Sequence, residues 1–159
     1  MVKFEARPAV PEDVSLLYRR LRNEDLEEII TNHDTDVRRV LLSGVQNSTE
    51  AWTFLWDGVP ESIGGIIRQE DGSGIIWQLG SVEVKRHSRR FLVKAREIVR
   101  KWRRQYPVIH NFVGVKSTGA HRFLRWLGFV ITDAPMTAAG DKAVKLYYFY
   151  WRRDSDVQS

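Results

Sequence analysis

A short basic stretch of the chain carries the residue types that bind anions. Residues 84–91 read VKRHSRRF, and six of them carry basic or polar side chains: Lys85, Arg86, His87, Ser88, Arg89 and Arg90. Ammonium and guanidinium groups donate charge-assisted hydrogen bonds to phosphate, and histidine titrates near neutral pH. The stretch therefore fits a phosphate site, a nucleic-acid contact, or the charged start of a solvated helix.

The charge of the chain is concentrated around this stretch. Residues 85–104 hold ten of the 25 Lys and Arg residues but one of the 20 acidic residues. This segment has a formal charge of +9 in a chain of +5, so the remainder carries −4. Such asymmetry favours an anionic partner for the segment, with a solvated helix face as the alternative.

Other residue types exclude several kinds of chemistry. The chain contains no cysteine, which excludes disulfides, thiolate metal sites and a cysteine nucleophile. The four histidines, His33, His87, His110 and His121, lack metal-ligand spacing, so we expect no metal. The sequence around Ser117 shows no nucleophile-elbow pattern, which argues against a serine hydrolase.

Length and composition predict one folded domain. The chain has 159 residues, 43% hydrophobic, with 18 aromatic residues. We expect a single domain over residues 1–152 and a polar tail over residues 153–159. No apolar run approaches the roughly 20 residues of a membrane span, and the start of the chain lacks the apolar core of a signal peptide. We therefore expect a cytoplasmic protein with no membrane partner.

Periodicity predicts the elements of the first half of the chain. A strand over residues 4–9 precedes a helix that begins near Pro11. A second helix follows, with Asn23 as its N-cap, and a third is capped by Thr35 and stopped at Gly44.

The second half begins with strands. Three strands are predicted over residues 51–58, 61–69 and 75–84, and turns at Asp57-Gly58 and at residues 71–74 separate them. A basic helix follows over Ser88–Gln105. A strand over residues 108–115, a helix from Ser117 or Thr118 to a stop at Gly128, and strands over residues 129–133 and 145–151 complete the prediction.

Three local motifs accompany this order of elements. STGAHRFLRWLGFVI, residues 117–131, is similar to an amphipathic helix that ends in Leu-Gly-Phe in the GNAT superfamily, the acyl-CoA N-acyltransferases. RPAVPEDVSLL, residues 7–17, and WDGVPESIGGI, residues 56–66, are similar to the N-terminal opening and middle hairpin of that superfamily. The resemblance covers nearly the whole chain. It implies an α+β GNAT-like fold, with a mixed, mostly antiparallel central sheet of about seven strands flanked by helices.

A narrower resemblance involves four short motifs. AWTFLWDG, WQLGS, RHSRRFL and RWLGF are similar to segments of GNAT-like proteins encoded by tailed bacteriophages. Some members of that group are internal virion or accessory proteins. This resemblance implies a phage protein, located in the host cytoplasm or in the virion.

The wider resemblance implies acetyl-CoA as cofactor if the chain is active. GNAT proteins bind the pyrophosphate of CoA with backbone N–H groups at the start of the helix after the fourth strand, where glycines permit a close approach. The matching stretch here has no glycine. Either its basic side chains bind the pyrophosphate, or its bulk fills the loop and excludes the cofactor. The candidate cofactor residues are Val84, Lys85, Arg86, His87, Ser88, Arg89, Arg90 and Ser117, the last at the position usually occupied by Asn.

Acyl transfer to an amine also requires a base and often an acid. Glu83 is the carboxylate nearest the end of the predicted fourth strand and is the candidate base, with a surface ion pair as the alternative role. The resemblance places Leu124 where the family often has a tyrosine that serves as the general acid, and leucine cannot donate a proton. Alternation on the last strand puts Tyr148 and Tyr150 on one face and Tyr147 on the other, and we expect them to serve packing.

These observations support two main hypotheses. The first is an acetyl-CoA-dependent N-acetyltransferase that acts on an unknown amine or protein acceptor. The second is a catalytically inactive GNAT-like phage protein that binds a phage or host protein. A third, direct nucleic-acid binding by the basic helix, is the weakest, because the aromatic residues in that helix, Phe91 and Trp102, both suit the core.

Overall fold

The computed structural model describes residues 2–31, 36–86, 88–138 and 141–154. The strands in these ranges form one eight-stranded sheet in the order β1-β2-β3-β4-β5-β8-β6, and β7 also pairs with β8. Their bounds are β1 Phe4–Pro8, β2 Glu50–Trp56, β3 Val59–Arg68, β4 Gly74–Gly80, β5 Val108–Gly114, β6 Val130–Ile131, β7 Met136–Ala138 and β8 Asp141–Arg152. Only the β4–β5 contact is parallel among the neighbouring pairs. The prediction of a mixed, mostly antiparallel sheet is confirmed.

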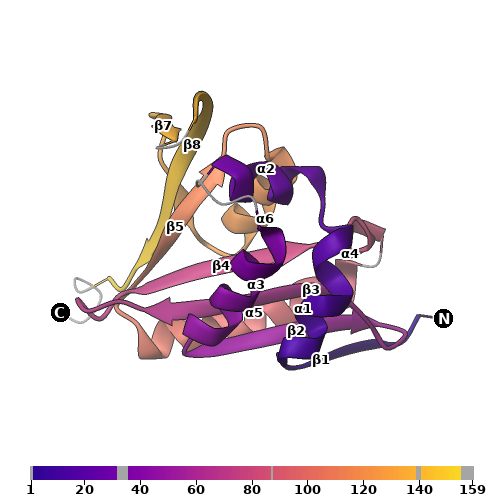
Figure 1. Ribbon diagram of the computed structural model, residues 1–159. Helices are drawn as coiled ribbons and strands as arrows, with labels where there is room; N and C mark the ends of the chain where they lie inside the picture. Colours follow the sequence, from indigo (N-terminus) through magenta and orange to yellow (C-terminus); the bar gives the residue numbers. More distant parts are fainter. Residues whose placement is uncertain (1, 32–35, 87, 139–140, 155–159) are drawn as a thin grey trace.

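Helices cover both faces of this sheet (Figure 1). Their bounds are α1 Pro11–Leu17, the 3₁₀ helix η1 Tyr18–Arg20, α2 Asn23–Thr31, α3 Val37–Asn47, α4 Glu83–Arg86, α5 Ser88–Gln105 and α6 Thr118–Trp126. The front layer in Figure 1 contains α1 and α3, and α5 lies behind the sheet. The basic helix has the bounds that the sequence predicts.

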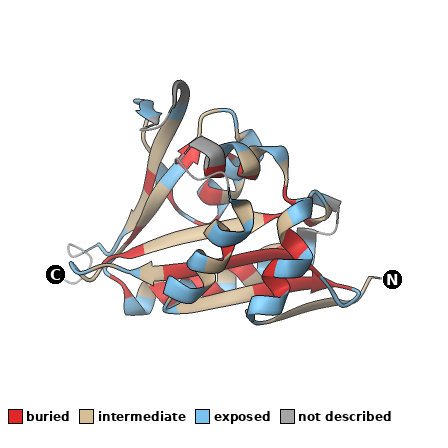
Figure 2. Cartoon of the chain, viewed as in Figure 1, coloured by how far each residue is buried: buried red, intermediate tan, exposed pale blue. Residues whose placement is uncertain are grey.

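Two apolar cores hold the layers together. The front core joins α1, α3 and β3 through buried residues that include Leu17, Leu41 and Ile63. The rear core is larger and joins the sheet to α5 and α6, with Phe91 of α5 and Ile66 of β3 among its members. Figure 2 shows this distribution, with buried residues concentrated on the central strands and exposed ones on the outer sides of the helices.

Two predicted helix starts differ from the structure. α2 includes Asn23 as its first residue, so Asn23 is not the cap outside it. Thr35, the predicted cap of the third helix, lies outside the described residues. The N-cap of α3 is Asp36, whose carboxylate accepts a hydrogen bond from the Arg39 N–H at 3.1 Å.

The predicted stop of the third helix at Gly44 is wrong. α3 continues to Asn47, and Gly44 lies inside it against the Trp77 ring. A Cβ on Gly44 would lie 3.2 Å from that ring. Glycine here permits a close contact between helix and sheet, and does not end the helix.

Two strand predictions also differ from the structure. The strand predicted over residues 75–84 ends at Gly80, and residues 83–86 form α4. The short strand β7 had no prediction in the sequence. It pairs with the start of β8, with Met136 opposite Leu146.

Candidate cofactor-binding site

A V-shaped opening separates the two parallel strands of the sheet. β4 and β5 pair at only two positions, Gly74 with Ile109 and Ile75 with His110. At the apex, the side-chain amide of Asn111 donates to the Ile76 carbonyl at 2.7 Å. Beyond this bond the strands diverge toward their carboxyl ends (Figure 1).

The open edge of β4 presents backbone polar groups. The Ser81 N–H donates to the Glu61 carbonyl at 2.8 Å. This bond and the strand register determine which residues of β4 form backbone hydrogen bonds with β3. Because backbone groups alternate between the two edges of a strand, the N–H and C=O of Gln78 point away from β3 and toward the opening. An extended ligand in the opening can therefore bond to β4 at Gln78.

The end of β4 is held by α2. The Gly80 N–H donates to the Asp25 carboxylate at 2.8 Å, and the Gly80 carbonyl accepts from the Arg22 N–H at 2.9 Å. Burial raises the pKa of Asp25, although Arg22 and the Gly80 N–H both favour its charged form. The bonds to Asp25 of α2 and to Arg22, which precedes α2, thus occupy the last backbone groups on the open edge.

A second buried acid strengthens the same end of the sheet. Glu61 accepts hydrogen bonds from the Arg20 guanidinium at 2.5 Å and from the Ser81 hydroxyl at 3.0 Å. Sequence reasoning missed Asp25 and Glu61. Neither lies in a local motif, because Asp25 and Gly80 are 55 positions apart and Arg20 and Glu61 are 41 apart.

A helical turn, α4, follows β4 at the position where the sequence resemblance implies a glycine loop. The Ser81 hydroxyl accepts from the Glu83 N–H at 3.2 Å, and the Lys85 N–H bonds to the Val82 carbonyl at 3.2 Å. Val84 is buried in the rear core, so its side chain faces away from any ligand. Backbone donors for a phosphate must therefore come from the start of α5, at Ser88–Arg90.

The basic side chains of this stretch have different partners. Lys85 is exposed and its Nζ lies 3.6 Å from a carboxylate oxygen of Glu24. Arg89 and Arg90 are exposed, and neither side chain has a hydrogen bond or ion pair with any residue in the described ranges. The first turn of α5 contains no acidic residue, so its dipole and both guanidiniums attract an anion. His87 and the side chains of Arg86 and Ser88 lie outside the described part.

The second arm of the opening leads into α6. Ser117 is the N-cap of α6, but its hydroxyl does not cap the helix. Its N–H bonds to the Gly114 carbonyl at 3.1 Å. The starts of α5 and α6 therefore follow the diverging ends of β4 and β5, which brings the predicted residues Arg89, Arg90 and Ser117 to the two arms of one opening.

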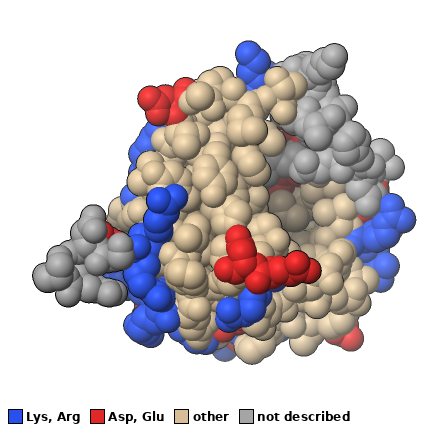
Figure 3. All heavy atoms as spheres, turned by 90° about the vertical axis from the view of Figure 1, so that its left-hand side faces the viewer, with Lys and Arg blue, Asp and Glu red and all other residues tan. Residues whose placement is uncertain are grey.

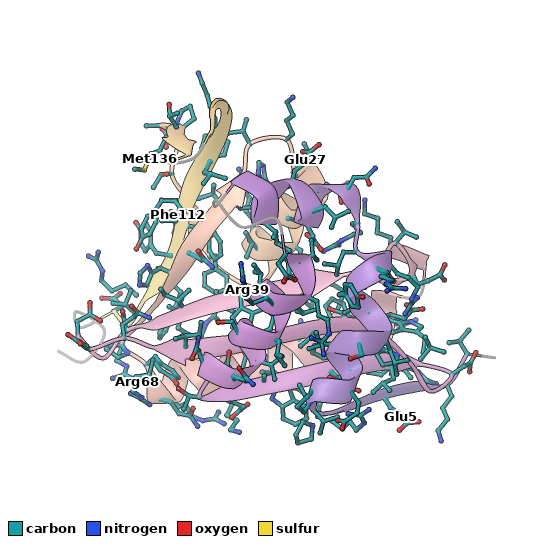
Figure 4. All side chains as sticks on the ribbon, in the orientation of Figure 1. Glu5, Glu27, Arg39, Arg68, Phe112 and Met136 are labelled. Carbon is teal, nitrogen blue, oxygen red and sulfur yellow. The ribbon has the colours of Figure 1, made fainter. Side chains whose placement is uncertain are left out.

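Leu124 and the tyrosines of β8, which were considered for the role of the acid, make packing contacts. Leu124 is buried in the rear core. Tyr147 packs edge-to-face on His121 with centroids 5.6 Å apart, whereas Tyr148 stacks on Tyr150 at 5.9 Å. The predicted alternation is confirmed. Tyr148 also contacts Phe112 (labelled in Figure 4), and burial raises the pKa of its hydroxyl.

A solvent-open hollow lies on the front of the molecule. It measures about 550 Å³ and is lined by residues of η1, of α2 and of the start of α3 with its N-cap: Tyr18, Arg19, Leu26, Asp36, Val37 and Arg38. Figure 4 labels Glu27 and Arg39 on α2 and α3, next to these lining positions. The walls carry both charge signs and an aromatic ring, so the hollow can receive a polar molecule.

Within the described ranges, no group of three or more His, Asp or Glu residues could hold a metal ion. None of the helices described is long and apolar enough to cross a membrane.

Comparison with known proteins places this arrangement of elements. No protein-family model matches the chain, and no curated protein matches its sequence. Solved structures do match. An acetyltransferase of the GNAT family from Streptococcus pneumoniae is 17% identical with a TM-score of 0.67, over 96% of this chain and 100% of the other. A ribosomal-protein-alanine N-acetyltransferase from Brucella melitensis is 14% identical with a TM-score of 0.70, over 93% and 99%.

A third structure was solved with the cofactor. The aminoglycoside acetyltransferase AAC(6′)-Ib in complex with coenzyme A is 16% identical with a TM-score of 0.66, over 99% of both chains. At these identities the likeness concerns the fold. With the order of elements and the β4–β5 opening, it shows that this chain has the α+β fold of the GNAT acetyltransferases.

Proposed function

We propose that the opening between β4 and β5 binds an acyl-CoA, and that the protein is an acetyl-CoA-dependent N-acetyltransferase. The observation that carries this proposal is the early end of the β4–β5 pairing, after two residue pairs. The separation exposes the β4 edge at Gln78. It also directs the starts of two helices toward one opening, as a ligand with a polar chain and phosphates requires.

The described residues fit the parts of the cofactor. The start of α5 with Arg89 and Arg90 would hold the pyrophosphate, the Gln78 backbone would bond to the pantetheine amides, and the unused Ser117 hydroxyl would contact the same chain. Lys85, Arg86, His87 and Ser88 stay proposed phosphate contacts, and Val84 would contribute backbone only. The cofactor supplies the activated thioester from which the acyl group is transferred.

A carboxylate at the end of β4 would accept the proton of the amine. Glu83 is the proposed base, because it begins α4 directly after the opening. Asp25 is a second carboxylate at the same end, where its Oδ2 accepts from the Gly80 N–H, and burial raises its pKa. The amine acceptor would enter from the hollow between η1, α2 and the start of α3.

A second candidate function is binding without catalysis. Two observations favour it: α4 occupies the position of a glycine loop, and the apolar Leu124 takes the position of the family's tyrosine. In this case the protein would be a phage component that recognises a phage or host protein. That origin rests on the sequence resemblance alone, since the three solved structures named above are not described as phage proteins.

Isothermal titration with CoA and acetyl-CoA tests cofactor binding. We expect saturable binding, weakened about tenfold or more by the double substitution Arg89→Gln and Arg90→Gln, because two charge-assisted bonds to phosphate are lost. The matched control is Arg104→Gln with Arg125→Gln, which removes the same charge from exposed positions away from the opening. If CoA at millimolar concentration produces no heat of binding and no thermal shift of the protein, the proposal is wrong.

Thiol release separates the enzyme from the binding-only protein. The chain contains no cysteine, so any thiol that forms during incubation with acetyl-CoA and a panel of amines is free CoA. An enzyme releases thiol only when an amine is present, and Glu83→Gln or Asp25→Asn slows the release. CoA binding without release by any amine supports the second candidate.

A further inference from the structure

The outer surface of α5 and α6 carries a row of arginines, of which the proposed acyl-CoA site uses only Arg89. We define the α5–α6 basic face by Arg89, Arg96, Arg100 and Arg104 of α5 and by Arg122, Arg125 and Trp126 of α6. The four α5 arginines follow one another at spacings of 7, 4 and 4 residues. At 3.6 residues per turn they lie within an arc of about 80° and span about 22 Å along the helix.

These arginines differ from the lysines of the same helix. Lys94 pairs with Glu97 at 3.4 Å, and Lys101 pairs with Glu50 of β2 at 2.8 Å, on the flank of α5 that faces the first strands. By contrast, no arginine of the basic face forms an ion pair with an acid of the described ranges. The neutralised charges are therefore on the flank, and the unneutralised ones form the outer row.

An exposed aromatic platform lies beside this row. Trp126 is 45% exposed, and the Arg96 guanidinium lies 4.8 Å from the centroid of its ring. Phe123 stacks on the same indole with centroids 6.5 Å apart and supports it from within α6. Sequence reasoning considered only the aromatic residues of α5, both of which are buried, and so missed this platform.

The surroundings of the face extend its positive potential. Arg153, which follows β8, donates to the Arg103 and Arg104 carbonyls at the end of α5. Figure 3 shows Lys and Arg side chains in a column on the side of the molecule that lies behind the sheet in Figure 1. Glu97, the one acid of α5, is the ion-pair partner of Lys94 and leaves the arginine row unneutralised.

We propose that the α5–α6 basic face binds single-stranded nucleic acid, with the arginine row on the phosphates and Trp126 under a base. Guanidiniums suit phosphates because their planar fork bonds two oxygens, and an exposed ring paired with an arginine is a platform for base stacking. The exposed large apolar side chains on this face are Val93 and Trp126, which provide little area for insertion into a membrane. A partner protein of acidic character would use the charges but not the stacking platform.

Fluorescence anisotropy with a labelled oligothymidine of about 20 nucleotides tests this proposal. We expect binding at about 50 mM salt, with a logarithmic salt slope of about −3 if four phosphates are neutralised. The triple substitution Arg96→Gln, Arg100→Gln and Arg104→Gln should weaken binding at least about tenfold and reduce the slope by about 2. Arg89 is left intact because it belongs to the proposed CoA site.

Two controls make the result specific. The triple substitution Lys3→Gln, Arg19→Gln and Arg38→Gln removes the same charge elsewhere and should leave affinity within about twofold. Trp126→Leu should cost about tenfold, and Trp126→Phe should retain most of the affinity, as loss of stacking predicts. All the substituted arginines and lysines are exposed or half-buried, and thermal unfolding checks each variant.

Three results would overturn the proposal. The first is no binding at low salt. The second is an equal loss in the two triple variants, which would mean that net charge alone attracts the oligonucleotide. The third is binding to phosphatidylserine vesicles that the oligonucleotide does not displace, which would identify an anionic membrane as the partner. The affinity of the Arg96, Arg100 and Arg104 triple variant for CoA distinguishes this face from the proposed CoA site. We expect this affinity to equal that of the wild type.

Discussion

Gly128 ends α6 in a backbone conformation that other residues rarely adopt. Its φ is +96°, and a Cβ there would lie 2.7 Å from the Arg103 guanidinium. We expect Gly128→Ala to reduce the free energy of unfolding by about 2 kcal/mol, because it adds backbone strain and displaces Arg103 from the Leu127 carbonyl. Gly119→Ala is the matched control, because Gly119 lies within α6 and has open space at the Cβ position. This substitution should raise the free energy of unfolding by about 0.5 kcal/mol. Urea unfolding measures both, and equal effects would contradict the account.

Asp13 fixes α1 to the first strands. Its carboxylate accepts from the Arg7 guanidinium at 2.8 Å, from the Thr53 hydroxyl at 2.6 Å and from the Val10 N–H at 3.0 Å. Burial acts to raise the pKa of Asp13, but these bonds outweigh it and hold the pKa below its usual value. Asp13→Asn should therefore reduce the free energy of unfolding by about 2 kcal/mol at pH 7. This is less than the loss for a fully buried ion pair, because Arg7 is half-exposed.

The cost of Asp13→Asn depends on pH in a known direction. Because the folded pKa is depressed, the carboxylate stabilises the protein above its unfolded pKa of about 4 and loses this effect as pH falls through the folded pKa. The difference in the free energy of unfolding between wild type and Asp13→Asn should thus be complete at pH 7 and should shrink below about pH 4. Denaturant unfolding at several pH values measures it, with exposed Glu12→Gln as a control that should change stability by less than about 0.5 kcal/mol. A gap that does not depend on pH would contradict the assignment.

Single residues were predictable where their signal is local. Gly128 follows an amphipathic helix and is read as its stop, and alternation correctly separates Tyr147 from Tyr148. The buried acids Asp25 and Glu61 were not predictable, because their partners come from elements far apart in the chain.

At the scale of elements, the apex of the β4–β5 opening depends on one side chain. The Asn111 amide donates to the Ile76 carbonyl and its oxygen accepts from the Phe112 N–H at 2.8 Å. Asn111→Ala would leave the Ile76 carbonyl without this donor, and we expect a loss of about 1 to 2 kcal/mol. Amide hydrogen exchange should accelerate in β4 and β5 while β1 and β2 are unchanged. Unchanged exchange at the apex would show that the side chain does not hold it.

α4 is, with β7, an element that the sequence analysis did not predict. Residues 81–84 alternate polar and apolar types, which predicts a continuing strand, and the prediction extended β4 to Val84. The Ser81 hydroxyl instead accepts from the Glu83 N–H, a local bond that competes with strand pairing and turns the chain. A serine two residues before a glutamate was a usable signal, but tertiary packing of Val84 decides the outcome.

For the whole molecule, the order of elements together with the local motifs that resemble the GNAT superfamily predicted the fold. The basic helix, the central strand β5 and the Leu-Gly-Phe motif lie where the sequence places them. The opening between β4 and β5 could not be derived from periodicity alone. Strand pairing ends where Asn111 and the α2 contacts to Gly80 allow, and these are tertiary contacts.

If acyl-CoA occupies the opening between β4 and β5, backbone amide NMR during titration with CoA will detect it there. We expect saturable shifts of the amides of Gln78, Arg89, Arg90 and Ser117, which lie on the two arms of the opening. Amides on the front helices and on the outer face of α6 should not move. The absence of shifts at millimolar CoA, or shifts confined to the part of the α5–α6 basic face beyond Arg89, would overturn this proposal.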